Sequence, residues 1–183
     1  PIKEIRTSVL MDNIALVFQD KMLFFDTIEE NIRIGNKTAT FEDVKRAACA
    51  AQCHEFIEAL PDGYQTLVGE GGTYLSGGEM QRLALARAIL KDAPVILLDE
   101  ATAFADPENE GKILEAFSHL IKGKTVLVIA HRLGTITNAD HILYLDKGMI
   151  TEKGTHEELL ALHGAYAHMW KTYNRAKEWI IDR

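Results

Sequence analysis

The stretch Leu75–Arg82, with the sequence LSGGEMQR, constrains the fold of this chain more than any other feature. Ser76 is followed three residues later by Glu79, which is the spacing of a capping box and predicts the start of a helix. Apolar residues at helical spacing behind it predict a helix that continues to about Leu90. The first turn of a helix presents unpaired N–H groups at the positive end of its dipole, and two glycines leave those groups accessible. The sequence therefore predicts an exposed anion seat that suits a phosphate.

A strand that ends in two acids is predicted directly after this helix. Val95–Leu98 is a short apolar run, typical of a strand buried on both faces, and Asp99 and Glu100 follow it. Acids at the carboxyl end of a buried strand lie where open α/β sheets bind ligands. A phosphate seat followed by two such carboxylates indicates a nucleotide with its metal ion. A well-capped helix without any ligand is the alternative that the signature stretch alone leaves open.

The composition is that of an acidic chain with one domain. Its 183 residues, 47% of them hydrophobic, are enough for a sizeable core. The net charge of −7, from 27 acidic and 20 basic residues, argues against a surface that binds nucleic acid. No apolar run approaches the length of a membrane-spanning helix, and we expect no signal peptide. Cys49 and Cys53 are predicted to be small apolar side chains on one helix face rather than metal ligands, and the cytosol is the expected compartment.

The remaining sequence predicts alternating strands and helices. A strand at Ile14–Phe18 is followed directly by Gln19. The range 40–60 is predicted as helix, with Thr40 as its cap and an imperfect capping box in which Asp43 replaces the usual Glu or Gln. Further helices are predicted at 28–34, from 107 to about 121, from Thr155 and at 165–181, with strands at 126–129 and 140–145. In the last helix, Tyr166, Met169, Trp170 and Tyr173 recur at helical spacing and predict a packing surface.

The residues Gly123–Thr125, GKT, are those that end a phosphate-binding P-loop. The full pattern requires a glycine five positions earlier, where this chain has Ser118. A P-loop also follows a strand and precedes a helix, whereas here the predicted order is reversed. We therefore interpret these residues as a turn from a helix to a strand.

Taken together, these motifs resemble those of the ATP-binding-cassette (ABC) ATPases. LSGGEMQR is similar to the signature motif of that family, and VILLDEAT is similar to its Walker B motif. Val17–Asp20 resembles the Q-loop, His131 matches the histidine of the H-loop, and Asp106 matches the aspartate of the D-loop. Thr66–Gly72 resembles the loop that precedes the signature in exporters. The sequence ATAFADPEN resembles that of a subgroup of the family that handles siderophores or related small metabolites.

The resemblance implies an α/β fold, namely a P-loop NTPase core of the ABC type with a mostly parallel sheet and an inserted α-helical subdomain. Residues 1–26 would be a core segment with the Q-loop, 27–90 the helical subdomain with the signature, and 91–183 the catalytic core with the Walker B motif, the D-loop, the H-loop and the C-terminal helices. The family's Walker A segment precedes the Q-loop, and this sequence has none. We therefore expect a fragment that lacks the first strands and the P-loop, is inactive alone, and leaves the strands at 126–129 and 141–145 facing a gap.

The resemblance also implies the chemistry, which is attack of water on the terminal phosphate of ATP bound with Mg²⁺. Asp99 would hold Mg²⁺, Glu100 would be the general base, and Gln19 would reach both the metal and the water. His131 would contact the terminal phosphate. The residues implied to bind an ATP held by the opposite ATPase domain are Leu75, Ser76, Gly77, Gly78 and Glu79 of the signature and Asp106 of the D-loop.

The implied parent is an exporter-type ABC transporter at the cytoplasmic face of the cell membrane. Its expected partners are a second ABC ATPase domain, in a homodimer or a heterodimer, and the transmembrane domain of the transporter, with no nucleic acid. One alternative is a non-catalytic subunit that supplies only the signature half of a partner's site. The other is a soluble ABC-type ATPase that acts on DNA or the ribosome, which the acidic composition disfavours. An upstream sequence with or without G-x-x-x-x-G-K-[ST] would decide the first alternative.

Overall fold

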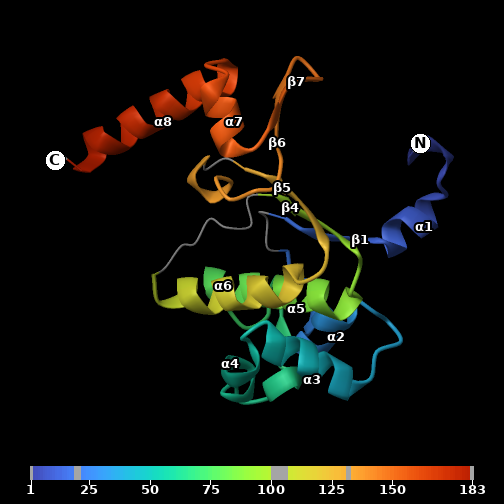
Figure 1. The fold of residues 1–183 in the computed structure, drawn as a ribbon. Coiled ribbons are helices and arrows are strands. Elements are labelled where there is room, and N and C mark those ends of the chain that lie inside the picture. The colour runs from blue at the N-terminus through green and yellow to red at the C-terminus, as the bar shows by residue number, and fades with distance from the viewer. Residues whose placement is uncertain (1, 19–21, 100–106, 131–132, 182–183) are drawn as a thin grey trace. The chain divides into compact units, whose positions relative to one another are not determined.

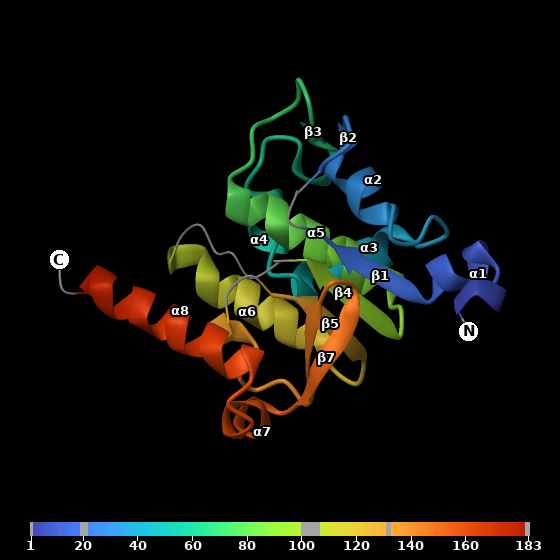
Figure 2. The same ribbon diagram turned by 90° about the horizontal axis from the view of Figure 1, so that it is seen from above.

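The structure, a computed structural model, describes residues 2–18, 22–99, 107–130 and 133–181. The chain divides into two compact units, Pro1–Ile129 and Ala130–Arg183, which are described separately. Figures 1 and 2 show the elements of each unit from two directions. The first unit contains η1 (Ile2–Glu4), α1 (Thr7–Asp12), β1 (Ile14–Val17), β2 (Asp26–Thr27), α2 (Ile28–Arg33), α3 (Phe41–Ala50), α4 (His54–Glu58), η2 (Gly63–Gln65), β3 (Leu67–Val68), α5 (Gly77–Lys91), β4 (Val95–Asp99), α6 (Pro107–Ile121) and β5 (Thr125–Ile129). The second contains η3 (Leu133–Thr135), β6 (Ile142–Asp146), β7 (Met149–Gly154), α7 (His156–Ala161) and α8 (Ala165–Ile181).

The main sheet of the first unit is parallel, as the resemblance implies. Its strand order is β1-β4-β5, and Leu16 lies opposite Leu97, which lies opposite Leu127. In the described part of the chain β5 pairs only with β4, while β6 pairs only with β7 in a separate sheet. Both β5 and β6 therefore have an unpaired edge among these residues, as expected for the strands at 126–129 and 141–145.

One face of this sheet is buried and the other is open in the described structure. Ala15 and Val17 of β1 are buried, together with Ile96 and Leu98 of β4, and all belong to the main hydrophobic cluster. On the alternate positions Leu127 is 52% exposed. The prediction that Val95–Leu98 is buried on both faces is therefore wrong for one of them, since Val95 and Leu97 are only half-buried. Alternate residues of a strand point to opposite faces, and the packed helices cover only one.

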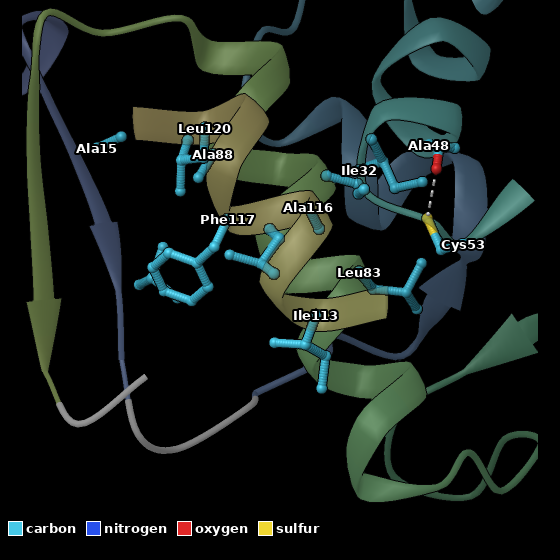
Figure 3. Packing of buried hydrophobic residues seen from close by; sticks show 14 of the residues in the cluster. Ala15, Ile32, Ala48, Cys53, Leu83, Ala88, Ile113, Ala116, Phe117 and Leu120 are labelled. Atoms are coloured by element: carbon cyan, nitrogen blue, oxygen red, sulfur yellow. Dashed lines mark hydrogen bonds between the residues drawn. The ribbon is translucent and has the colours of Figure 1, made fainter. Parts of the chain in front are cut away.

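Helix α5 lies at the centre of the first unit. Figure 1 shows α5 and α6 between the sheet and the layer formed by α2, α3 and α4. The core residues of α6 are Ile113, Ala116, Phe117 and Leu120, and Figure 3 shows them beside Leu83 and Ala88 of α5. Gln81 and Arg82 are also buried, although the sequence pattern predicts only one buried face for this helix. A helix enclosed by several layers buries polar positions as well as its apolar stripe.

The range predicted as a single helix from Thr40 breaks into two helices. Gln52 adopts φ 55°, a left-handed conformation that ends α3, and α4 begins two residues later. Cys49 is consequently exposed at the end of α3, whereas Cys53 is buried just before α4. The prediction that both cysteines share one helix face is wrong for this reason. The Cys53 thiol donates a hydrogen bond to the Ala48 carbonyl at 3.3 Å, as Figure 3 shows, and burial raises its pKa.

The GKT residues form the turn that the sequence predicts. Helix α6 ends at Ile121, and the Lys124 backbone N–H donates to the Ile121 carbonyl at 3.1 Å. Gly123 has φ 70°, a conformation that glycine adopts without steric cost. Strand β5 then begins at Thr125, so the geometry here is that of a helix-to-strand connection.

The second unit packs two helices against a β-hairpin. Lys147 and Gly148 have φ of 48° and 79°, as a two-residue hairpin turn requires, and join β6 to β7. Strand β6 begins at Ile142, two residues after the predicted start. Tyr166 is fully buried, and burial raises the pKa of its phenol. The predicted packing surface on the last helix is confirmed, since Met169, Trp170 and Tyr173 pack on the same cluster.

The start of α8 is capped from β7. The Glu152 carboxylate accepts hydrogen bonds from the backbone N–H groups of Ala165 at 2.6 Å and Tyr166 at 3.2 Å. These are two of the N–H groups that a helix start leaves without an intrahelical partner. Gly164 lies against this carboxylate, so that a Cβ at that position would displace the Glu152 side chain.

Candidate functional site

The start of α5 forms the capping box that the sequence predicts. The Ser76 backbone N–H donates to Glu79 Oε2 at 2.8 Å, and the Glu79 backbone N–H donates to Ser76 Oγ at 3.3 Å. Leu75, directly before the cap, is buried and belongs to the main hydrophobic cluster. The position of the helix start is therefore fixed by an apolar anchor on one side and by reciprocal hydrogen bonds on the other.

The seat at this helix start is partly enclosed rather than fully exposed as predicted. Ser76, Gly77 and Glu79 are half-buried, and Gly78 is buried. The N–H groups of Gly77 and Gly78 belong to the first turn and have no partner within the helix. They stand beside the hydroxyl of Ser76 at the positive end of a 15-residue helix. These donors at one helix start suit the binding of a single anion.

The strands β1, β4 and β5 end together at one edge of the sheet. Val17 lies opposite Leu98, and Asp99 lies opposite Ile129. Because the three strands are parallel, the sequence that follows each of them begins at the same edge. Asp99 is half-buried there, at the end of β4. The other predicted site residues, Gln19, Glu100, Asp106 and His131, lie outside the described residues.

Sequence reasoning overlooks the burial of Arg82 within the signature. The Arg82 guanidinium carbon lies 5.2 Å from the centre of the Phe56 ring, a cation–π arrangement. Burial lowers the pKa of this guanidinium, an effect that the Cys53 thiol and Glu79 partly oppose. The pattern of apolar residues does not indicate a buried cation on α5. The one indication in the sequence is that Arg82 lies three residues after Glu79, one helical turn further along.

Large apolar side chains are exposed in the segment Met22–Phe25, between β1 and α2. Met22, Phe24 and Phe25 are 66%, 51% and 63% exposed. An apolar cluster before a helix can form a hydrophobic staple, and the resemblance to the ABC ATPases implies a surface here that receives a membrane domain. The half-buried Leu23 packs against the core, whereas the other three point outward. Within the described residues, no helix is both long enough and apolar enough to cross a bilayer.

The comparison with known families shows the family of this chain. Residues 1–103 match the profile of the family described as "ABC transporter". The chain belongs to the ABC transporter family. The matched region includes the start of α5 with its capping box and the end of β4 with Asp99.

This ABC transporter chain has long relatives of which it matches one part. It is 50% identical over 173 residues to a "Putative multidrug export ATP-binding/permease protein" of Staphylococcus aureus strain NCTC 8325. It has the same identity to the protein of that description in the bovine strain RF122. The match covers 94% of this chain and 30% of each relative's length.

A solved structure confirms the predicted fold of this ABC transporter chain. A bacterial Atm1-family ABC exporter with ATP bound superimposes with a TM-score of 0.83 and 43% identity, over 93% of this chain and 30% of that one. The α/β fold with a parallel sheet, and the resemblance to exporter-type ABC nucleotide-binding domains, are thereby established. ATP-driven transport is the general function of this family.

Proposed function

We propose that this chain is part of the ATP-binding domain of an ABC exporter, which couples hydrolysis of ATP bound with Mg²⁺ to transport across the membrane. The observation that carries the proposal is the start of α5, where Ser76, Gly77 and Gly78 present a hydroxyl and two N–H groups from a rigidly capped helix. Phosphate is the group that such a helix start binds best. Asp99, the last residue of β4, supports a metal ion in the proposed reaction, because a carboxylate is a ligand that Mg²⁺ prefers.

The signature residues would act on an ATP molecule held by a second domain. Ser76, Gly77 and Gly78 would donate hydrogen bonds to its terminal phosphate. Leu75 and Glu79 would hold that helix start in place through the apolar anchor and the capping box described above. Asp106, next to Pro107 at the start of α6, would take part in the contact between the two domains.

The strand-end residues would act on an ATP bound by this domain itself. A half-buried carboxylate is a hard oxygen donor of the kind that Mg²⁺ prefers, so the chemistry of Asp99 fits this ion. Gln19 would share the metal and orient the water, and Glu100 would accept a proton from that water. His131 would donate a hydrogen bond to the terminal phosphate. Bound Mg²⁺ would supply neutralisation of the phosphate charge.

The proposed partners are a second ABC ATPase domain and the membrane domain of the same transporter. Two domains, each with a signature and a strand-end site, would form two complete sites when they close on two ATP molecules. The exposed segment Met22–Phe25 would contact the membrane domain, because the relatives are ATP-binding/permease proteins and this chain spans 30% of their length. In this proposal the domain lies at the cytoplasmic face of the cell membrane. In this proposal residues 27–90 form the helical subdomain, and 1–26 and 91–183 form the core.

The test is the substitution Ser76→Arg in the full-length transporter, with Thr40→Arg as the matched control. Both residues are N-caps with a complete capping box, so either change removes a cap that is worth about 1 kcal/mol. Thermal melts should show similar small losses for the two variants. ATP hydrolysis should stop in Ser76→Arg and persist in Thr40→Arg, because only Ser76 would contact the partner's phosphate. Normal hydrolysis in a folded Ser76→Arg protein would refute the proposal.

A further inference from the structure

The buried side chain of Asn31 forms hydrogen bonds to the backbone of the exposed segment Met22–Phe25. Asn31, in α2, is 1% exposed. Its Oδ1 accepts a hydrogen bond from the Phe24 backbone N–H at 2.9 Å, and its Nδ2 donates to the Phe24 carbonyl at 2.9 Å and to the Thr27 carbonyl at 3.0 Å. The amide therefore pairs with both backbone groups of Phe24, as a neighbouring strand would. The Phe24 side chain, held in this way, projects outward.

Arg87 connects this segment to the helix that carries the phosphate seat. Its Nε donates to the Asn31 carbonyl at 2.9 Å, its Nη2 to Asn31 Oδ1 at 3.3 Å and its Nη1 to the Met22 carbonyl at 3.4 Å. Burial lowers the pKa of this guanidinium. A planar fork of donors can reach three acceptors on two segments at once, which a lysine ammonium cannot do in the same geometry.

The backbone of Gly69 packs closely against the same segment. It has φ 91°, and a Cβ at this position would lie 2.6 Å from the Phe24 carbonyl oxygen and 2.7 Å from the Phe25 nitrogen. Gly69 belongs to the stretch that leads into the signature. Gly71, two residues later, also has a positive φ of 84° but has no atom within 4 Å of such a Cβ. The close approach is therefore specific to Gly69 and the Phe24–Phe25 peptide.

We propose that Arg87 and Asn31 are positioning residues that couple the phosphate seat at Ser76 to the exposed segment Met22–Phe25. Both ends of the coupling are attached to α5: Ser76 caps its start, and Arg87 lies in its last half, about 16 Å along at the usual rise per residue. A displacement of this rigid helix moves Arg87, and the hydrogen bonds to Asn31 and Met22 carry the segment with it. The inference rests on the proposed function, in which an ATP molecule contacts Ser76 and the membrane domain contacts the segment.

The test measures hydrogen exchange in the full-length transporter, with and without the magnesium complex of a non-hydrolysable ATP analogue. In the wild type the analogue should slow exchange both at the start of α5 and at residues 22–27. In Arg87→Lys the start of α5 should respond as before, while most of the slowing at 22–27 should be lost. Arg46→Lys is the matched control, because Arg46 pairs with Asp43 on the surface of the same unit. It should leave both responses intact.

The outcomes separate this inference from the function on which it rests. If the wild type shows no change at the start of α5, the proposed function fails. If the wild type responds at both places and Arg87→Lys does too, the coupling role of Arg87 is wrong. Should Arg87→Lys not fold, Gly69→Ala and Gly71→Ala provide the same comparison, since only the first displaces the Phe24 carbonyl. Equal responses at 22–27 in these two glycine variants would then overturn the inference.

Discussion

Lys124 Nζ lies 2.8 Å from Asp92 Oδ1, and this ion pair joins the turn after α5 to the turn before β5. Asp92 ends α5 in a left-handed conformation with φ 49°, and the Lys124 side chain is only 14% exposed. The lysine of the GKT sequence thus forms an ion pair between two turns. Its geometry differs from that of a phosphate-binding lysine, which extends from a loop between a strand and a helix.

Lys124→Met should therefore leave the affinity of the full-length transporter for ATP unchanged. Methionine keeps the apolar stem and removes the ion pair, which has one well-exposed partner, so the free energy of unfolding should fall by about 1 kcal/mol at most. Denaturant melts and nucleotide titrations on the same preparation check both statements. A large loss of ATP affinity would show that Lys124 contacts the nucleotide after all.

Glu100→Gln in the full-length transporter should retain ATP binding and nearly abolish turnover. The amide has the size of the carboxylate but cannot accept a proton from the attacking water. The bound ATP should then hold two ATPase domains together, which size-exclusion chromatography of the solubilised domains or cross-linking detects. Hydrolysis near the wild-type rate would show that Glu100 is not the base and that the Walker B assignment is wrong.

The 183-residue chain alone should bind MgATP weakly. The P-loop backbone and its lysine make most of the phosphate contacts in P-loop NTPases, and the sequence contains no G-x-x-x-x-G-K-[ST] pattern. Calorimetry on the purified chain measures this directly. Stoichiometric binding below the millimolar range would contradict the role given to that segment.

Asp43 should make the stability of the first unit depend on pH in the acid range. Hydrogen bonds from the Thr40 hydroxyl at 2.6 Å and the Thr40 backbone N–H at 2.8 Å lower the pKa of the Asp43 carboxyl. A carboxyl with a lowered pKa in the folded state stabilises the fold above its ordinary pKa of about 3.9, and this contribution disappears as the pH falls through the folded value. The Tm of the wild type should thus fall more steeply than that of Asp43→Asn between about pH 5 and pH 3. Parallel curves would show that this cap does not contribute.

Local signals in the sequence are sufficient for the helix starts. The boxes at Thr40, Ser76 and Thr155 each form as a helix begins, because a capping box needs only four consecutive residues. The start of the signature helix, which defines one half of the candidate site, can therefore be predicted without knowledge of the fold. The same holds for the GKT turn, where one missing glycine excludes a P-loop.

Contacts between distant residues are not visible in this way. Arg87 and Asn31 are 56 positions apart, and neither residue type signals the other. The break at Gln52 and the open face around Leu127 also depend on what packs nearby rather than on the local pattern. The sequence thus predicts which residues belong to the phosphate seat, whereas the residues that attach the seat to the rest of the domain emerge only from the structure.

The carboxylate of Glu152 links the start of the last helix to a part of the chain that is synthesised earlier. This group caps α8 from a strand that lies 13 residues earlier in the chain. On the ribosome, β7 is synthesised before α8, so the acceptor that starts the last helix is present before the helix itself. The first turn of the helix at 165–181 is thus stabilised by a group outside the helix, which belongs to the hairpin.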